Sequence, residues 1–176
     1  MTVGARIASV LLVLFAALVQ VSIVHRIEVG SASPDVLILV VASIALLTGS
    51  VSGAAHGFLA GVALATFAAL PLGPHALVGT LIGFAIGRVG DALATDDHPI
   101  PPLLAGIFAA LTMQLGEPLV EFLVNPAVSG VDGLVGRAAL VTLISAVLAV
   151  PVYVVVRRTL ISANSVGPVL DREVAS

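Results

Sequence analysis

The sequence predicts an all-α membrane protein, a polytopic bundle of about six transmembrane helices with both ends of the chain in the cytoplasm. Of the 176 residues, 59% are hydrophobic and only 10% are charged, and the mean hydropathy is +1.21. A soluble domain averages about 45–50% apolar and about 25% charged residues. Apolar segments recur from residue 7 to residue 156. Residues 1–160 are therefore expected to form a single transmembrane domain, followed by a disordered cytoplasmic tail over residues 161–176.

The first three spans follow from apolar runs and their end signals, because a crossing helix needs about 20 mostly apolar residues. The first covers residues 7–24, where a long apolar core without an Ala-x-Ala site favours an uncleaved helix over a secretory signal. The second begins after Pro34-Asp35, residues that suit a helix start. It is short unless the small residues TGSVSG continue it. The third covers residues 53–70 and stops at the turn signal PLGPH.

The last three spans surround the most hydrophilic stretch of the chain, GDALATDDHPIPP. The fourth span covers residues 76–89 and is also short, so it either sits in a thinned region or begins at Leu72. The fifth covers residues 103–124. The sixth covers residues 138–156 and ends at the pair Arg157-Arg158.

Arginine placement predicts the orientation, because cytoplasmic loops carry the excess of positive residues. With six spans and an inside N-terminus, five arginines are cytoplasmic and two are outside. The cytoplasmic ones are Arg6, Arg88, Arg157, Arg158 and Arg172, and the outer ones are Arg26 and Arg137.

Glycines recur at every fourth position of the third and fourth spans: Gly53, Gly57 and Gly61, followed by Ala65, and then Gly79, Gly83 and Gly87. Positions four apart lie on one helix face, so each span presents a ridge with almost no side chains. In lipid, such ridges allow the close backbone contact that holds helices together. The short PLGPH connection predicts an antiparallel hairpin. The ridges then either face each other or pack on other helices, and a substrate groove lined by backbone is the third interpretation.

Polar residues within the spans are few, and three of them share one face of the fifth span: Gln114, Glu117 and Glu121. An ionisable group at mid-span costs about 2.5–3.5 kcal/mol on insertion scales, so it is a functional candidate. Pro118 removes a backbone hydrogen bond beside them and could kink the helix. The interpretations are a partly wet helix end, a polar seam that contacts a partner membrane protein or lines a small cavity, and a proton or cation pathway. The last lacks matching charges on a second span.

Signals for catalysis, cofactors or metals are absent from the sequence. There is no cysteine, and the stretch GSVSG has Val51 where a serine-hydrolase elbow needs serine. His98 and Asp96-Asp97 are expected to form a solvated loop rather than a metal site, and His56 is expected to be a hydrogen-bonded interfacial residue. No basic run could hold a nucleic acid. We therefore expect no catalytic residue, no cofactor, no metal and no enzyme activity.

The stretch from residue 34 to residue 89 carries a series of local motifs. They are Pro34-Asp35 before an apolar span, Gly57-Phe58 with Gly61, Pro71-Leu72-Gly73 with His75-Ala76-Leu77, and Gly79, Gly83 and Gly87 before Arg88. In this order they resemble the rod shape-determining protein MreD family, whose size and number of spans also agree. The resemblance covers about a third of the chain. Many members carry an aspartate where this chain has Ala65-Thr66, so no charge-based role is carried over to that position.

The resemblance implies a non-catalytic membrane subunit of the bacterial cell-elongation machinery in the cytoplasmic membrane. Such proteins associate with the bitopic partner MreC, and through it with the actin-like MreB and with peptidoglycan glycosyltransferase and transpeptidase enzymes. The family fold is related to the substrate-binding subunits of energy-coupling-factor vitamin transporters. That kinship provides the alternative function, a membrane subunit that captures a vitamin or another small metabolite.

Composition favours the scaffold over the transporter subunit. A vitamin ring is normally held by aromatic contacts and a few convergent polar groups. Aromatic residues are only 4% of this chain, with no tryptophan, one tyrosine and six phenylalanines. A scaffold instead predicts a bundle closed by small residues, without a ligand cavity of useful size.

Overall fold

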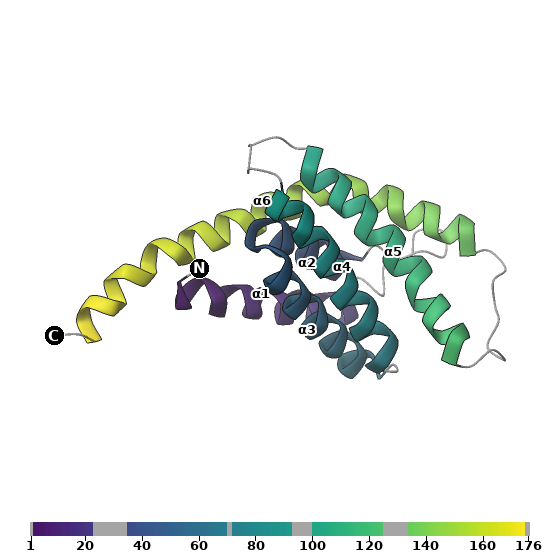
Figure 1. Cartoon of the computed structure of the whole chain (residues 1–176), viewed down its shortest axis with the longest axis horizontal. Coiled ribbons are helices and arrows are strands. Elements are labelled where there is room, and N and C mark those ends of the chain that lie inside the picture. The colour runs from purple at the N-terminus through teal and green to yellow at the C-terminus, as the bar shows by residue number, and fades with distance from the viewer. Residues whose placement is uncertain (1, 23–34, 70–71, 93–99, 125–133, 175–176) are drawn as a thin grey trace.

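The computed structural model describes residues 2–22, 35–69, 72–92, 100–124 and 134–174, and these ranges contain six helices and no strand. All the helices except α2 are long and apolar enough to cross a membrane. The predicted all-α membrane bundle is therefore confirmed (Figure 1). The inside location of both termini and the likeness to transporter subunits stay predictions. The helices are α1 (Val3–Ser22), α2 (Val36–Thr48), α3 (Ser50–Ala68), α4 (Leu72–Ala92), α5 (Ile100–Val124) and α6 (Leu134–Val174).

Helix α2 forms the centre of the bundle and contacts each of α1, α3, α4, α5 and α6. It is apolar around its whole circumference, and every residue from Leu37 to Ala45 is buried. Its 13 residues span about 20 Å, which is less than the hydrocarbon thickness of about 30 Å. The helix ends at Gly49, where φ is 86° and ψ is 178°, a conformation essentially restricted to glycine. Within the TGSVSG segment, Gly49 thus separates α2 from α3, so the segment does not lengthen the second span.

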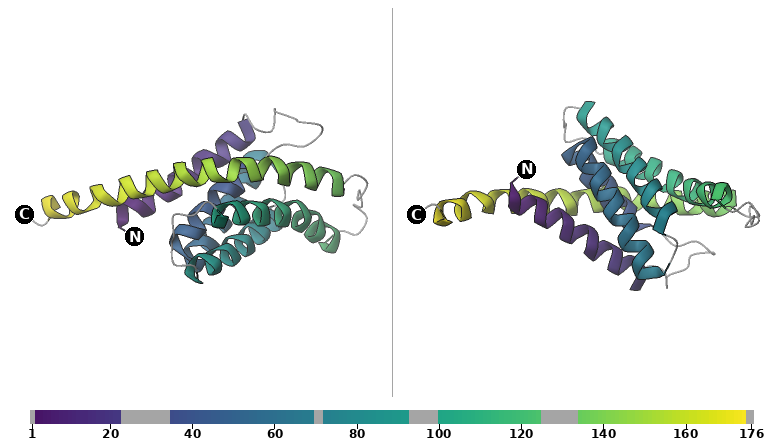
Figure 2. Two further views of the ribbon diagram at one scale, coloured as in Figure 1. Left: turned by 90° about the horizontal axis from the view of Figure 1, so that it is seen from above. Right: turned by 60° about the horizontal axis from the view of Figure 1, so that its bottom comes forward.

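Helices α3 and α4 lie side by side in opposite directions and share the largest helix–helix interface of the bundle (Figure 2). Helix α4 begins at Leu72, so the longer of its two predicted starts is confirmed. With 21 residues it is long enough to cross the hydrocarbon without a thinned region. Between α2 and this hairpin lies an apolar core whose fully buried members include Val41, Ile44 and Ile82.

Helices α5 and α6 pack on each other along one side of the molecule (Figure 1). Helix α5 continues through Pro118. Helix α6 has 41 residues, about 60 Å, and its far end extends beyond the rest of the bundle (Figure 2).

Helix α6 extends past the predicted sixth span as far as Val174. The division into a domain over residues 1–160 and a tail over residues 161–176 stays a prediction. Neither glycine nor proline interrupts the chain between residues 152 and 166. The end of this stretch also packs on α1. The backbone N–H of Thr2 donates to Oδ1 of Asn164 at 3.3 Å, and the carbonyl oxygen of Ala163 faces Gly4. Tertiary contact with α1 therefore supports a turn of helix beyond the apolar span.

Candidate functional site

The glycine ridges of α3 and α4 face each other. A Cβ atom placed on Gly53 would collide with the carbonyl oxygen of Gly83, and the reverse substitution would collide with the carbonyl oxygen of Gly53. One turn further along, Gly57 and Gly79 make the same reciprocal contact, and a Cβ on Gly79 would lie 2.5 Å from the carbonyl oxygen of Gly57. Real Cβ atoms essentially never come within 3.0 Å of such atoms. The two backbones therefore touch at a distance that only glycine permits.

The contact continues at both ends of the hairpin. Gly61 meets the backbone of His75, and a Cβ on Gly87 would lie 2.5 Å from the Cα atom of Ser50. We call the six glycines of this contact the glycine seam: Gly53, Gly57, Gly61, Gly79, Gly83 and Gly87. Each member is buried. The sequence left open whether the glycine ridges of the third and fourth spans face each other or pack on other helices. In the structure they face each other.

A small cavity borders the glycine seam, between α2, α3, α4 and α5. Its volume is about 10 Å³, and its lining includes Asp35, Leu64 and Met113. This is room for about one water molecule. Backbone atoms of Gly57 and Gly79 reach this cavity, but the backbone does not border a groove large enough for a substrate here.

Asp35 and Gln20 of α1 together accept hydrogen bonds from free backbone N–H groups at the start of α2. The Oδ1 atom of Asp35 accepts a hydrogen bond from the N–H of Ile38 at 3.0 Å, and Gln20 accepts one from the N–H of Val36 at 3.0 Å. Gln20 is only 3% exposed. Free N–H groups at a helix start need partners, and a buried unpaired one is costly. The Pro-Asp motif thus contributes a helix cap at the edge of the central core.

The other motif residues occupy different environments. Phe58 is 55% exposed on the outer side of α3, whereas His75 is buried at the start of α4. Gly73 has no atom within 4 Å of the position that a Cβ would take. Pro34 and Pro71 lie outside the described residues.

The polar face predicted on the fifth span lies on α5. Gln114 is half-buried, and Glu117 and Glu121 follow it one and two turns later on the same helix. The large apolar side chains of Leu115 and Leu119 are exposed on this part of α5. Within the described residues no group of three histidine, aspartate or glutamate side chains could hold a metal ion. His98 and Asp96-Asp97 lie outside those residues.

The model of the family described as rod shape-determining protein MreD matches residues 2–162, which is nearly the whole chain. The chain belongs to the MreD family. No curated protein and no solved structure matches it. It is therefore a multi-pass membrane protein of a family that determines rod shape, and this family is one of structural proteins and not a known enzyme family.

The sequence analysis did not predict a polar link between α1 and α3 in this MreD-family protein. Nε2 of His56 lies 2.8 Å from the hydroxyl of Ser9, and Nδ1 lies 2.8 Å from the carbonyl oxygen of Ser52. The Ser9 hydroxyl also lies 2.8 Å from the carbonyl oxygen of Arg6, and Ser9 is fully buried. A sequence signal existed. Ser9 and Gln20 are eleven residues apart, about three turns, and all the residues between them are apolar, so the two mark one face of the helix.

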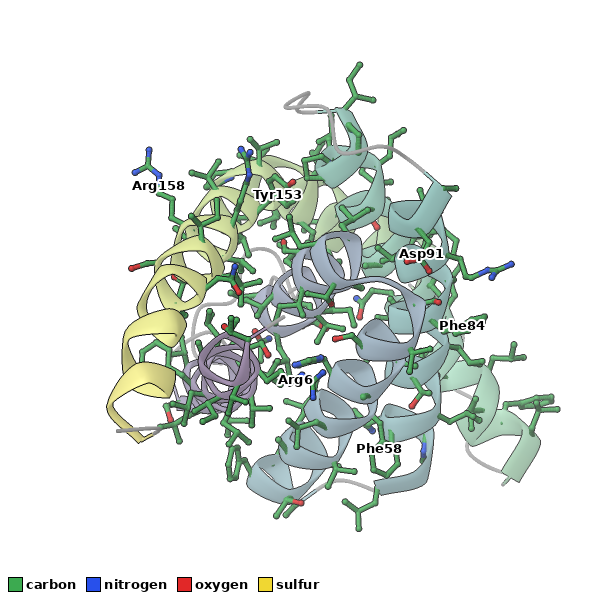
Figure 3. All side chains as sticks on the ribbon, turned by 60° about the vertical axis from the view of Figure 1, so that its left-hand side comes forward. Arg6, Phe58, Phe84, Asp91, Tyr153 and Arg158 are labelled. Carbon is green, nitrogen blue, oxygen red and sulfur yellow. The ribbon has the colours of Figure 1, made fainter. Side chains whose placement is uncertain are left out.

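A second unpredicted link holds the junction of α2 and α3. The carboxylate of Asp91, near the end of α4, accepts a hydrogen bond from the backbone N–H of Ser50 at 3.0 Å. It lies against Gly49, at the junction itself (Figure 3). An acid at the first residue of a helix complements the helix dipole. Asp91 therefore stabilises the start of α3 from the neighbouring helix.

The MreD-family bundle also has an apolar groove between α4 and α5, with a volume of about 490 Å³. All the residues that line it are apolar: Ala85, Ile86, Val89, Ile100, Pro101, Leu104, Ala105 and Phe108. A metabolite site needs a few convergent polar groups to orient its ligand. This groove has none among its lining side chains, so it suits hydrocarbon surface only.

Proposed function

We propose that this protein is a non-catalytic scaffold subunit of the bacterial cell-elongation machinery. In this role it helps maintain rod shape by associating with an MreC-like membrane protein and positioning peptidoglycan synthesis. The glycine seam is the observation that carries the proposal beyond family membership. It closes α3 on α4 backbone to backbone and, with α2 at the centre, makes a compact body in which the cavity beside the seam holds about one water. A compact body of this kind suits docking rather than capture of a small molecule.

The partner contact is assigned to α5. Among the described helices, α5 packs extensively only on α2, α4 and α6, so one side of it is free. Gln114, Glu117 and Glu121 follow one another at helical spacing along α5. In a membrane, polar side chains between helices contribute about 1–2 kcal/mol in model peptides. A bitopic partner with a complementary polar residue in its single span would bind these three polar residues of α5 specifically.

The proposed location is the bacterial cytoplasmic membrane, with both termini inside. Support comes from the arginines, five of which fall on the inner side of a six-span arrangement. The central helix α2 is short for a full crossing. In this proposal it traverses as the core of the bundle, shielded by its neighbours from lipid. MreB-like filaments and the wall-synthesis enzymes are reached through the MreC-like partner, and no nucleic acid takes part.

The alternative function, an energy-coupling-factor type subunit for a vitamin or metabolite, has less support. The cavity within the core is too small for such a ligand, and the α4–α5 groove has no polar lining. No specific observation favours the alternative.

Affinity purification of the full chain from native membranes tests the proposal. Cell-elongation proteins, with an MreC-like protein first among them, are expected in the eluate. The double variant Glu117→Lys/Glu121→Lys is expected to lose most of that partner, because two cations then replace the two acidic residues of the proposed contact. Arg158→Glu, a charge reversal at an exposed position of α6, is the control and should keep it. Recovery of an ATPase module, or full partner recovery with the α5 variant, would count against the assignment.

A further inference from the structure

Two hydroxyl groups of α6 are buried without a hydrogen-bond partner among the residues that the structure describes. They are Oγ1 of Thr142 and Oγ of Ser145, and Ser145 is fully buried. An unpaired buried hydroxyl lowers stability, because it loses its hydrogen bonds to water and gains none in return. A pair of such groups inside a membrane bundle therefore needs a physical reason.

Five other hydroxyls show that a helix can satisfy such a group by itself. Each donates to the carbonyl oxygen four residues earlier in its own helix, at 2.6–2.9 Å. They belong to Ser43, Thr48, Thr66, Thr80 and Thr159. The same bond is open to Thr142 and Ser145 by rotation about χ1, but neither side chain makes it. Both hydroxyls therefore keep their bonding capacity for a group outside their own helix.

The two hydroxyls lie on the side of α6 that packs on α5. Ala149 follows Ser145 by about one turn on the same face. A Cβ placed on Gly106 of α5 would lie 2.5 Å from the Cβ of Ala149. The two helices run in opposite directions (Figure 1). Thr142 lies seven residues before Ala149 and Gln114 lies eight residues after Gly106, so these two polar residues are at nearly the same depth.

Thr142 lies at the edge of this contact, next to the surface. The residue as a whole is half-buried, so its hydroxyl is turned inward. Ala139, which is exposed, and Ala146, which is half-buried, share its face of α6. Small residues let another membrane helix approach closely, and threonine in a helix occupies two χ1 rotamers. One rotation therefore presents the hydroxyl to a helix that packs along these alanines.

We propose that the edge of the α5–α6 contact receives the transmembrane helix of the partner protein, and that the Thr142 hydroxyl bonds to an uncharged polar side chain of that helix. Ser145, about one turn along the same face, then donates to the Thr142 oxygen. An amide or a hydroxyl side chain fits, because hydroxyl groups carry no charge to balance an ion. This rests on the proposed function, which assigns Gln114 to the partner contact, and it adds α6 as the second helix of that contact.

Binding of the MreC-like protein to the purified full chain tests the proposal, with the variant Thr142→Val/Ser145→Ala. Binding is expected to weaken by at least about threefold, the average effect of one hydrogen bond between membrane helices. The thermal midpoint of the chain without partner should stay unchanged or rise, because two unpaired buried hydroxyls are removed. Ser43→Ala/Thr159→Val is the matched control. It removes the same two types of hydroxyl where their own helices bind them, and binding should stay unchanged.

Ala139→Leu provides a second test that leaves the hydroxyls in place. Residue 139 is exposed, so the chain without partner should fold as before. The larger side chain should hold the partner helix away from α6 and weaken binding by at least about threefold, since the Thr142 hydrogen bond then cannot form. Val155→Phe adds bulk on the opposite face of α6, at a side chain that is 59% exposed, and should leave binding unchanged.

Unchanged partner binding by either Thr142→Val/Ser145→Ala or Ala139→Leu would overturn the proposal. A lower thermal midpoint of the Thr142→Val/Ser145→Ala chain would overturn it as well, because the hydroxyls would then be bonded within the bundle. If this variant instead separates two differently tagged copies of the chain and keeps the partner, the occupant is a second copy and the proposal is wrong. A failure of the unsubstituted chain to bind any MreC-like protein would contradict the proposed function itself, so the two failures are distinguishable.

Discussion

At Gly83, a hydrogen atom in place of a side chain decides how closely α3 and α4 approach. A Cβ there would meet both the carbonyl oxygen and the carbonyl carbon of Gly53, and these backbone atoms cannot rotate away as a side chain could. Glycine in a helix costs about 1 kcal/mol relative to alanine. The close contact of two backbones offsets this cost, because dispersion between helices drives their association in lipid.

Gly83→Ala is expected to destabilise the protein by about 1–3 kcal/mol, the usual cost of overpacking a well-packed contact. Gly73→Ala is the matched control. Gly73 lies on the same helix, and a Cβ there meets nothing within 4 Å, so the helix propensity gained should leave stability unchanged or raised. The measurement is the midpoint of thermal unfolding in detergent, followed by size-exclusion chromatography. Equal midpoints for the two variants would show that the seam does not hold the hairpin together.

At the scale of the elements, the polar link from α3 to α1 is the feature that fixes how the first helix packs. Ser9 is fully buried and His56 is half-buried, and their side chains meet 2.8 Å apart. The buried residues of α1 fall on one face that includes Ser9 and Gln20. Polar contacts at two depths therefore set the rotation of a helix that is entirely apolar between them.

A double-mutant cycle with Ser9→Ala and His56→Ala measures this link. Hydrogen bonds between membrane helices average about 0.6 kcal/mol in such cycles and reach about 1.7 kcal/mol. We expect a coupling free energy near the upper value, because the Ser9 hydroxyl is fully buried and would lose its partner in α3. Thr66→Ala in place of Ser9→Ala is the control, since Thr66 bonds only within its own helix, to Val62. Strictly additive effects of Ser9→Ala and His56→Ala would show that this hydrogen bond does not contribute to the packing of α1.

A helix and its contact face could be predicted from the sequence where one residue type recurs with the helical period. The fourfold spacing of Gly53, Gly57 and Gly61 predicted a bare ridge because four residues make about one helical turn. The break between α2 and α3 was harder to predict. It depends on the positive φ of Gly49 and on Asp91, which lies 41 positions from its partner Ser50. Contacts between residues so distant in sequence leave no local pattern, so the polar links made by Ser9 and Asp91 were missed. Asp35, which caps the helix next to it, was predicted as part of a helix start.

At the scale of the whole molecule, the helices differ widely in length. Helix α2 has 13 residues and α6 has 41, or about 20 Å and about 60 Å. The hydrocarbon core is about 30 Å thick. The bundle therefore combines a central helix that is shorter than the membrane with a peripheral one that extends well past it. Asn164, beyond the apolar part of α6, meets the start of α1, so these two ends of the bundle lie on the same side.

The orientation can be tested with single cysteines, because the chain has none of its own. Gly73→Cys places a thiol at the exposed start of α4, and Thr2→Cys places one before α1. We expect a membrane-impermeant maleimide to label residue 73 in intact cells or spheroplasts and to label residue 2 only after permeabilisation. The unsubstituted chain is the blank. The opposite pattern would place the termini outside and invert the assignment of the arginines.

The glycine seam also constrains how the gene can change. Any single-base change in the first two positions of a glycine codon introduces an amino acid with a side chain or a stop. Accommodating even a methyl group at residue 57 or 79 would require the opposite backbone to retreat along the whole hairpin. Related sequences that lack these glycines are thus expected to differ on the facing surfaces of both α3 and α4 at once.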